Sequence, residues 1–465
     1  MPGITQSTKH LFGTDGIRGV PGEYPLDDAT LERVGAALGE YLAAHPAGNS
    51  KVQRVLIGRD TRESGPHLAE LIARGLESAG AQPVSAGVVT TPGVAWLVSR
   101  EGFSAGVVIS ASHNPYHDNG VKLISSLGMK FPDAAEHEIE RLIPSREGRR
   151  LASGAVGARR ANRAHPHGDE KLHQDYLEGL CAAVLPGANL KGMKIVLDCA
   201  NGAASTLAPQ LFRMLGAQVA PINVKPDGKN INANCGSLHP EAMQKRVLDS
   251  GAALGVAFDG DADRAIFAGA SGKPVDGDGV LLVAGRYMKS AGTLKGNVIV
   301  GTTMANLGLE RALDQLGLKL VRTAVGDRYV LEEMLRISAN LGGEQSGHIL
   351  FLDDATTGDG MLTALKIASI VSLAGPLDSL VAGLKIYPQK IVNVRVKSKP
   401  ALESLPEVAR LVNEAQKTLG NSGRVILRYS GTEPLARVMV EAERDDDVRR
   451  WTDSLASALR AAIGA

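Results

Sequence analysis

The chain has 465 residues, of which 44% are hydrophobic, 22% charged and only 4% aromatic, and its formal net charge is +1. This length exceeds what one ordinary core covers and predicts about three or four soluble globular domains. This composition argues against a nucleic-acid or membrane partner, because a net charge near zero gives no strong electrostatic field and there are few aromatic side chains on which bases could stack. We therefore expect a small-molecule partner bound by local charge.

The cysteines Cys181, Cys199 and Cys235 form no CxxC spacing, which indicates a reducing cytosol and no zinc site. The N-terminus lacks the apolar core of a signal peptide. The longest uncharged stretch, residues 78–99, could span a bilayer, but Pro83 and Pro92 interrupt it and favour a strand followed by a loop. We therefore expect a cytoplasmic protein.

A repeated pattern organises most of the chain. Three apolar runs each end in a polar turn and enter a helical pattern: Val55-Leu-Ile-Gly-Arg-Asp-Thr, Ile195-Val-Leu-Asp-Cys-Ala-Asn-Gly and Val298-Ile-Val-Gly-Thr-Thr. A second run then opens into a polar loop: Gly106-Val-Val-Ile-Ser-Ala-Ser-His-Asn-Pro, Gly255-Val-Ala-Phe-Asp-Gly-Asp-Ala-Asp-Arg and Leu341-Gly-Gly-Glu-Gln-Ser-Gly-His. Each pair predicts an α/β domain whose loop lies at the carboxyl ends of its strands, where ligands bind.

From about Leu384 the pattern changes to that of a small α+β domain. Val392, Val394 and Val396 alternate with polar residues as in a half-buried strand, and a helix is predicted over 400–420. Two strands flank the loop 428–434, and the closing helix carries one apolar face: Val448, Trp451, Leu455, Leu459 and Ile463. The predicted fold is α/β, with three tandem α/β domains of mixed or parallel sheets (1–160, 161–269 and 270–383) and an α+β domain (384–465) around a central cleft.

An arginine-rich segment, 146–163, contains six arginines and one acidic residue. A solvated linker between the first two domains is favoured over an anion-binding patch. His165 and His167 flank Pro166 in the same linker, and this arrangement disfavours a metal site.

Three carboxylates follow the second apolar run of the second domain, in Asp259-Gly-Asp-Ala-Asp-Arg264. Alternate acids separated by small residues can converge on one hard cation and leave coordination positions open for a phosphate oxygen, which suits Mg²⁺. Arg264 stands where an EF-hand needs glycine, so that loop is excluded. The alternative is an acidic turn that caps a helix, but the position at a strand end favours metal binding.

A serine-containing loop follows the equivalent run of the first domain, in Ile109-Ser-Ala-Ser-His-Asn-Pro115. A serine needs a proton acceptor and charge compensation to act as a nucleophile. His113 and Lys122 can supply these, and Lys122 can act as acid or base if its pKa is lowered. A structural Ser/Asn/Pro turn is the alternative.

Two further loops carry polar groups suited to a sugar phosphate. Glu344, Ser346 and His348 offer donors and acceptors for adjacent sugar hydroxyls, although such a loop is often structural. Arg428-Tyr-Ser-Gly-Thr-Glu-Pro, with Arg437 beyond it, combines guanidinium groups, hydroxyls and backbone N–H groups as a phosphate cradle would. A tight hairpin is the alternative for this loop.

These four loops, together with Gly13-Thr-Asp-Gly-Ile-Arg-Gly19, resemble the α-D-phosphohexomutase family over the whole chain and in the right order. The opening Leu11-Phe-Gly-Thr-Asp-Gly-Ile-Arg-Gly-Val, the form Ser110-Ala-Ser-His-Asn-Pro, Gln345 and Val325-Gly-Asp-Arg-Tyr-Val330 are most similar to the bacterial branch that acts on glucosamine phosphates. The arginine-rich linker is the main departure from the family pattern.

The resemblance implies a role for each matching residue. Ser112 becomes the phosphoserine, and a phosphate oxygen on it holds one Mg²⁺ per active site together with Asp259, Asp261 and Asp263. Arg18, His113 and Lys122 surround the transferring group, with Lys122 as the proton shuttle. The implied substrate-binding residues are Arg264, Gly326, Asp327, Arg328, Glu344, Ser346, His348, Arg428, Ser430, Gly431, Thr432 and Arg437.

The implied reaction interconverts glucosamine 6-phosphate and glucosamine 1-phosphate, toward UDP-N-acetylglucosamine and cell-wall synthesis. One phosphoserine serves both ends of the sugar, so glucosamine 1,6-bisphosphate is the intermediate and activator. A mutase for mannose or glucose phosphates is one alternative. A catalytically silent sugar-phosphate-binding protein is another, although Ser112 and the three aspartates argue against it. The sequence leaves the oligomeric state open, with a homodimer as one option.

Overall fold

A computed structural model of the chain describes residues 11–13, 15–46, 52–143, 169–430 and 433–465. The chain divides into two units, one made of Met1–Met304 and Leu320–Val381 and the other of Ala305–Lys319 and Ala382–Ala465. The arginine-rich segment, together with His165 and His167, lies outside the described residues.

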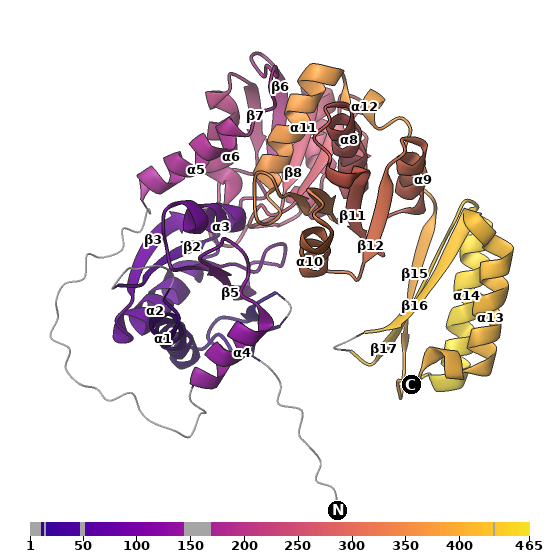
Figure 1. Cartoon of the computed structure of the whole chain (residues 1–465), viewed down its shortest axis with the longest axis horizontal. Coiled ribbons are helices and arrows are strands. Elements are labelled where there is room, and N and C mark those ends of the chain that lie inside the picture. Colours follow the sequence, from indigo (N-terminus) through magenta and orange to yellow (C-terminus); the bar gives the residue numbers. More distant parts are fainter. Residues whose placement is uncertain (1–10, 14, 47–51, 144–168, 431–432) are drawn as a thin grey trace, which may run out of the picture. The chain divides into compact units, whose positions relative to one another are not determined.

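Three sheets with one shared strand order make up the first unit (Figure 1). The orders are β1-β5-β4-β2-β3, β10-β9-β8-β6-β7 and β12-β11-β13-β14. In every sheet the first strand of the repeat (β2, β6 or β11) lies between the second and the third, and a fourth strand pairs antiparallel with the third. The predicted threefold α/β repeat with mixed sheets is confirmed.

The elements of the three repeats have the following bounds. The first contains β1 (Ile17–Gly19), α1 (Asp28–Ala44), β2 (Arg54–Arg59), α2 (Gly65–Ser78), β3 (Gln82–Val88), α3 (Thr91–Arg100), β4 (Ala105–Ile109), β5 (Asn119–Ser125) and α4 (Asp133–Leu142). The second contains α5 (Glu170–Ala182), β6 (Lys194–Asp198), α6 (Ala204–Met214), β7 (Gln218–Ile222), α7 (Glu241–Ser250), β8 (Leu254–Phe258), β9 (Ala265–Gly269) and β10 (Pro274–Val275). The third contains α8 (Gly277–Ser290), β11 (Val298–Thr302), β12 (Lys319–Thr323), α10 (Asp327–Ile337), β13 (Leu341–Gly343), β14 (Ile349–Phe351), α11 (Gly360–Ala374) and α12 (Leu377–Leu380).

The central strands are apolar because helices cover both faces of each sheet. Every residue of β4 and β8 is buried, as expected for strands inside an α/β sheet. In the first repeat, α1 and α2 approach closely at Gly75, where an added Cβ would lie 2.1 Å from the carbonyl oxygen of Glu32. A side chain at this position would therefore push the two helices apart.

The uncharged stretch 78–99 contains a strand and a helix, so the expected loop in its second half is wrong. Strand β3 ends at Val88, and α3 begins at Thr91. Pro92 lies in the first turn of α3, where a missing N–H costs nothing, and the Thr90 hydroxyl caps the helix by accepting from Gly93 N at 3.0 Å. Proline here starts a helix instead of ending the regular structure.

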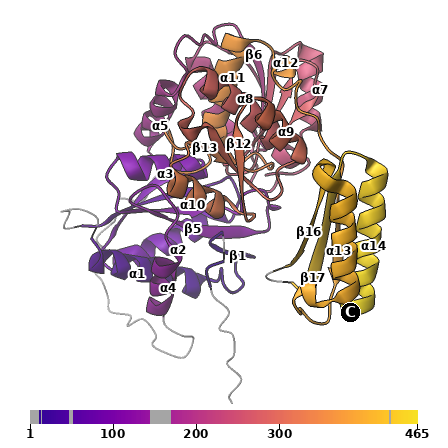
Figure 2. The same cartoon turned by 45° about the vertical axis from the view of Figure 1, so that its right-hand side comes forward.

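The second unit is an antiparallel sheet with two long helices, α13 and α14, on one face (Figure 2). Its elements are α9 (Leu307–Gln315), β15 (Gln389–Arg395), α13 (Pro406–Leu419), β16 (Gly423–Tyr429), β17 (Leu435–Ala442) and α14 (Asp445–Ile463), with strand order β15-β17-β16. The predicted apolar face of the closing helix is confirmed, since all five of its residues are buried. The helix predicted from residue 400 begins at Pro406, because Leu405 is extended, as residues before proline tend to be.

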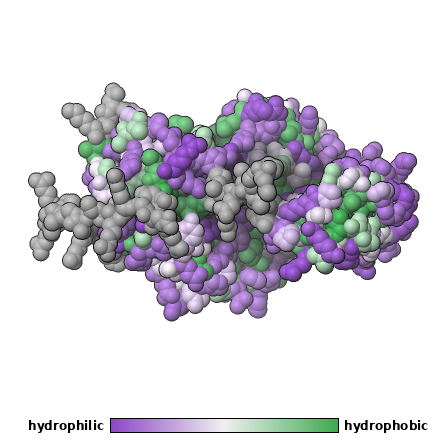
Figure 3. Space-filling view, turned by 90° about the horizontal axis from the view of Figure 1, so that it is seen from below, coloured by the Kyte–Doolittle hydropathy of each residue, from purple (hydrophilic) through white to green (hydrophobic). Residues whose placement is uncertain are grey.

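Among the residues that the structure describes, no helix is long and apolar enough to cross a bilayer. On the face drawn in Figure 3 hydrophilic residues predominate, and hydrophobic ones form small groups among them.

Candidate active site

Three loops of the first unit, each following the third strand of its repeat, converge. The Ser112 hydroxyl, beyond β4, donates to Asp259 Oδ2, beyond β8, at 2.6 Å. Asp263 Oδ2 lies 3.7 Å from Nδ1 of His348, which belongs to the loop after β13. The repeat therefore brings together a hydroxyl, an acidic cluster and a histidine from distant parts of the chain.

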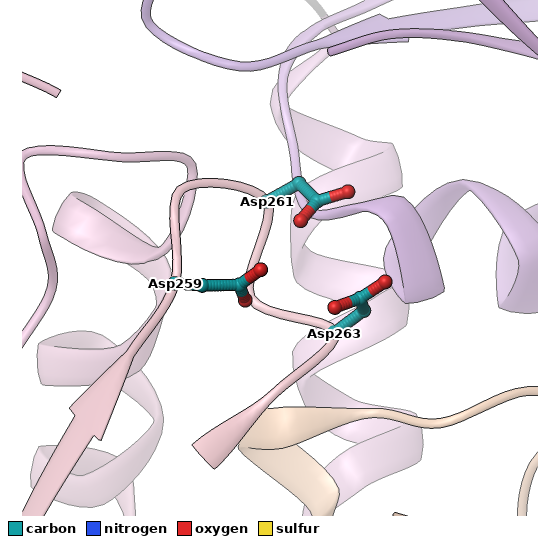
Figure 4. A group of neighbouring side chains, drawn as sticks. All are labelled: Asp259, Asp261 and Asp263. Carbon is teal, nitrogen blue, oxygen red and sulfur yellow. The ribbon is translucent and has the colours of Figure 1, made fainter. Parts of the chain in front are cut away.

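The acidic cluster consists of Asp259, Asp261 and Asp263, on the loop between β8 and β9 (Figure 4). All three side chains are buried, and one ligand atom from each lies within 4.8 Å of the others. Among the residues described, Oδ1 of Asp261 and Oδ1 of Asp263 have no hydrogen-bond partner. Buried carboxylate oxygens without donors fit a hard divalent cation, so the residues present are suited to a metal.

Burial and neighbouring charges shift the pKa values of Asp259 and Asp263 in opposite directions. Burial, followed by repulsion from Asp263 and Asp261, raises the pKa of Asp259 well above its ordinary value. Burial acts in the same direction on Asp263, but His348, Lys122 and Arg264 outweigh it and hold the pKa of Asp263 well below its ordinary value. The neutral form is therefore favoured at Asp259 and the charged form at Asp263.

Lys122 supplies the buried positive charge next to the cluster. Its Nζ lies 3.2 Å from Asp261 Oδ2, 3.5 Å from Asp15 Oδ1 and 3.9 Å from Asp263 Oδ2. Burial opposes the charged form, yet these carboxylates outweigh it and raise the pKa of Lys122. This is the reverse of the lowered pKa that the sequence argument required for Lys122 to act as a free base.

The Ser112 loop is held from several sides. The backbone N–H of Ser112 donates to Ser110 Oγ at 2.9 Å, and Arg18 Nη1 donates to the Ala111 carbonyl at 2.9 Å. His113 Nδ1 lies 3.4 Å from Ser112 Oγ. Burial, together with the nearby guanidinium groups of Arg264 and Arg18, lowers the pKa of His113, so its imidazole is neutral at neutral pH.

The predicted sugar loop lies at the turn between β13 and β14. Glu344 is half-buried and accepts from the Gly326 N–H at 3.1 Å, and Ser346 is exposed. Gln345 Nε2 donates to Asp276 Oδ2 at 3.0 Å, so the Gln345 side chain supports the loop from the protein side. His348 is buried, and its pKa is raised because Asp263 and Asp327 outweigh the effect of burial.

The remaining predicted residues of the first unit also form contacts within the protein. Asp327 Oδ2 accepts from Lys130 Nζ at 2.7 Å, and the Arg328 guanidinium pairs with Asp133 and with Glu332. Arg264 donates through its backbone N–H to Asp259 Oδ1 at 3.1 Å, and its Nε lies 3.8 Å from Asp263 Oδ1.

The predicted phosphate cradle belongs to the second unit. Arg428 and Arg437 stand directly opposite each other on the antiparallel pair β16–β17, and Arg428 is exposed. Like charges in such a pair repel, and Glu433 Oε2, 3.3 Å from Arg437 Nη2, offsets one of them. The exposed Arg428 guanidinium is suited to a further anion such as phosphate. Ser430 is buried, and its hydroxyl accepts from Glu433 N at 3.3 Å. Gly431 and Thr432 lie outside the described residues.

Sequence reasoning missed three residues that contact this site. Asp15 stands inside the motif Gly13–Gly19 but received no role, although it pairs with Arg18 and Lys130. Lys130 bridges Asp15 and Asp327. The Thr91 hydroxyl donates to Asp261 Oδ2 at 2.6 Å. Asp15 could have been found from its motif, whereas Lys130 and Thr91 lie outside every motif.

Similarity to known proteins covers the whole chain. Four domains of the phosphoglucomutase/phosphomannomutase family match in order: alpha/beta/alpha domain I over residues 9–150, domain II over 174–272, domain III over 276–387 and the C-terminal domain over 391–458. A phosphoglucosamine mutase of Solibacter usitatus is 52% identical, with 98% of this chain and 99% of the relative covered. One of Koribacter versatilis is 49% identical, with 100% of this chain and 99% of the relative covered.

Solved structures show the same fold. A phosphoglucomutase/phosphomannomutase family protein of Burkholderia thailandensis has a TM-score of 0.75 and 23% identity, with 97% of each chain covered. The N-acetylphosphoglucosamine mutase of Aspergillus fumigatus, solved with GlcNAc-6P and magnesium, has a TM-score of 0.63 and 19% identity, with 98% of this chain and 96% of that chain covered. The resemblance predicted from the sequence is confirmed. The chain therefore belongs to the phosphoglucomutase/phosphomannomutase family, the α-D-phosphohexomutases, and within that family to the phosphoglucosamine mutases.

Proposed function

We propose that this chain interconverts glucosamine 6-phosphate and glucosamine 1-phosphate, with Ser112 carrying the phosphoryl group between transfers. One observation carries the proposal most directly: Ser112 Oγ lies 2.6 Å from Asp259 Oδ2, in a buried cluster of three carboxylates. A hydroxyl at the edge of a cation site is the arrangement that phosphoryl transfer through a serine needs. The sequence relatives that share this chain's full length support the amino-sugar substrate.

Asp259, Asp261 and Asp263 would hold one Mg²⁺, which neutralises charge on phosphoryl oxygens when bound. The protein's own cations complete this neutralisation. Arg264 lies beside Asp263, and Arg18 donates to the Ala111 carbonyl next to Ser112. Fixed positive groups stabilise charge that develops during transfer, and they need no rearrangement at the moment of reaction.

Proton transfer falls to His113 and Lys122. His113 is neutral because its pKa is lowered, and its Nδ1 lies 3.4 Å from Ser112 Oγ, so it can accept a proton. Lys122 carries a proton at Nζ, and its raised pKa makes it a weak acid, which can still protonate the strongly basic oxygen that leaves from Ser112. The two side chains thus begin in opposite protonation states, as an acid and a base must.

Two transfers complete one turnover. In the first, the free sugar hydroxyl attacks the phosphoserine phosphorus and gives its proton to His113. The bond from phosphorus to Ser112 Oγ breaks, and Lys122 protonates that oxygen. The product is glucosamine 1,6-bisphosphate. In the second, the bisphosphate has reversed its orientation, and Ser112 Oγ attacks the other phosphate and returns its proton to Lys122. The bond from that phosphorus to the sugar oxygen breaks, and the sugar oxygen takes a proton from His113. The phosphate that is not transferred would be bound by Arg428, Ser430, Gly431, Thr432 and Arg437, since a charge-based site can accept either end.

Sugar recognition would rest on Glu344 and Ser346. The half-buried Glu344 carboxylate offers an ammonium group at carbon 2 a charge-assisted hydrogen bond, and a hydroxyl at the same carbon gains less. One such contact is worth about 1.5–3 kcal/mol, which corresponds to roughly ten- to a hundredfold in selectivity. We expect discrimination that is real but incomplete.

A coupled assay of glucosamine 6-phosphate alongside glucose and mannose 6-phosphates tests the proposal. The highest kcat/KM should belong to glucosamine 6-phosphate. In Glu344→Gln, kcat/KM on glucosamine 6-phosphate should fall more than kcat/KM on glucose 6-phosphate. Equal or better kcat/KM on glucose or mannose phosphates would assign the chain to those substrates instead. Binding without turnover of any of the three would make it a sugar-phosphate-binding protein.

A further inference from the structure

Arg62 is a buried arginine that the reaction described above does not use. It follows β2 in the first repeat, and it is 0% exposed to solvent. Its guanidinium donates to three carbonyl oxygens of the Ser112 loop: Nη2 to Ser112 O at 3.0 Å and to Asn114 O at 2.9 Å, and Nη1 to Pro115 O at 2.9 Å. One side chain therefore fixes three peptide groups of the loop that carries the reacting serine.

Asp60 extends this contact into a closed network. Asp60 Oδ2 lies 3.0 Å from Arg62 Nε and accepts from Ser110 Oγ at 2.6 Å. Ser110 Oγ in turn accepts from the Ser112 N–H at 2.9 Å. Arg62 thus binds the carbonyl of Ser112, and Ser110 binds the N–H of Ser112. Arg62 and Ser110 both contact the buried carboxylate of Asp60. The pair Asp60–Arg62 is charge-balanced, so its burial leaves no isolated charge.

The backbone at Ser112 needs such support. Its φ is 52°, in the left-handed region that residues with a side chain rarely adopt. A conformation of this kind persists only where the surroundings impose it. Asn232 adds a further donor to the Ser112 carbonyl, with Nδ2 at 2.9 Å. These donors fix the backbone conformation of Ser112, and this conformation sets the direction of its Oγ.

The other two repeats show that the fold itself does not require this arginine. A polar residue at the end of the first strand, or directly after it, accepts from the N–H two positions later in every repeat: Asp60 from Arg62 at 2.9 Å, Asp198 from Ala200 at 3.0 Å and Thr302 from Met304 at 3.1 Å. The turn is therefore made in the same way with arginine, alanine or methionine at that position. Arginine stands only in the repeat whose neighbouring loop carries Ser112.

We propose that Arg62 is a positioning residue that aims Ser112 Oγ at the phosphoryl group, an inference that rests on the proposed role of Ser112. A planar guanidinium holds its N–H donors in a rigid fork that reaches three carbonyls at once, whereas an ammonium group carries its three donors on one nitrogen at the end of a flexible stem. Arg62→Lys keeps a positive charge beside Asp60 but should loosen the loop. Misplacing a reacting atom by about 1 Å costs on the order of 100-fold in rate.

The test is steady-state kinetics of Arg62→Lys on glucosamine 6-phosphate, with the phosphorylation of Ser112 by glucosamine 1,6-bisphosphate followed by intact-protein mass spectrometry. We expect kcat and the phosphorylation rate to fall together, on the order of 100-fold, while KM stays unchanged. Arg286→Lys is the matched control, because it loses a similar bond, from Nη1 to the Leu380 carbonyl at 2.9 Å, in helix α8. The kcat of this control should equal that of the wild type.

A second variant keeps the test valid if Arg62→Lys folds poorly. Asp60→Asn combined with Arg62→Gln removes both buried charges together, and its kcat per folded molecule should also fall. A wild-type kcat per folded molecule in either variant would overturn the role of Arg62, as would a loss confined to KM. Failure of the proposed function is separate: turnover by Ser112→Ala would refute the phosphoserine itself, whereas an inactive Ser112→Ala with a fully active Arg62→Lys would refute only this inference.

Discussion

Two serines lie two residues apart in the same loop, and the structure assigns them different tasks. Ser112 Oγ donates to Asp259 in the acidic cluster, whereas Ser110 Oγ donates to Asp60 and accepts from the Ser112 N–H. Replacing each by alanine should separate chemistry from support. Ser112→Ala removes the phosphate acceptor, and Ser110→Ala leaves the acceptor in place but removes two buried hydrogen bonds.

The expected magnitudes differ accordingly. Loss of a covalent nucleophile typically lowers kcat by about 10⁴-fold or more, so Ser112→Ala should show no mutase turnover above background. Its stability should fall by about 1.5–3 kcal/mol at most, because one charge-assisted hydrogen bond to Asp259 is lost. Ser110→Ala loses a charge-assisted bond to Asp60, worth about 1.5–3 kcal/mol, and a neutral bond from the Ser112 N–H, worth about 1 kcal/mol. It should therefore be less stable by about 2.5–4 kcal/mol yet still turn over.

The assay combines turnover of glucosamine 6-phosphate, thermal unfolding and mass spectrometry of tryptic peptides. Phosphate should be found on Ser112 in the wild type and in Ser110→Ala, and it should be absent from Ser112→Ala. Turnover by Ser112→Ala, or phosphate on Ser110 alone, would refute the reasoning. Equal instability of the two variants with equal loss of activity would show that the loop collapses as a unit, which contradicts the separate tasks.

Three further predictions concern metal, pH and packing. Asp261→Asn should cut turnover severely, and EDTA should abolish wild-type activity until Mg²⁺ is restored; full activity in EDTA contradicts the cation site. Burial, with Asp133 nearby, raises the pKa of Glu136 from 4.5 to about 7, so the folded state gains stability as pH falls from about 7 to 4.5. Glu136→Gln should thus stabilise the protein by about 1 kcal/mol at pH 8 and by less near pH 5 in thermal melts, and a pH-independent difference would be inconsistent with this shift. Leu455→Ala, at a fully buried position of α14, should destabilise the second unit by about 2–5 kcal/mol in urea titrations, and an unchanged midpoint would argue against that core.

The sequence predicted the strands and loops of the repeat well because local pattern and burial agree there. The strands beginning near Val55, Ile195 and Val298 are apolar on both sides, and each occurs in the structure as β2, β6 and β11. Proline positions were the weak point. Pro92 starts a helix that was expected to be a loop, and Pro406 delays a helix that was expected from residue 400. A proline marks an element boundary, but the pattern alone does not say which element follows it.

Long-range contacts could not be predicted in the same way. Segment 305–319 interrupts the third repeat in sequence but belongs to the second unit, where the Leu307 N–H donates to Glu441 Oε1 at 2.9 Å. Similarly, the raised pKa of Lys122 comes from Asp15 and Asp261, which are far from it in the chain. Electrostatic environments of this kind depend on the tertiary arrangement, which residue spacing does not encode.

The threefold repeat explains how one fold assembles three kinds of chemistry at one site. Each repeat delivers the loop after its third strand to the same place: a serine in the first, three aspartates in the second, and Glu344 with His348 in the third. The backbone plan is common, so the loops can differ without changing how they are delivered. What the plan does not supply is charge balance, because buried carboxylates repel one another. Lys122, Arg264 and His348 supply that balance, because they lie 3.2 Å from Asp261, 3.8 Å from Asp263 and 3.7 Å from Asp263 respectively.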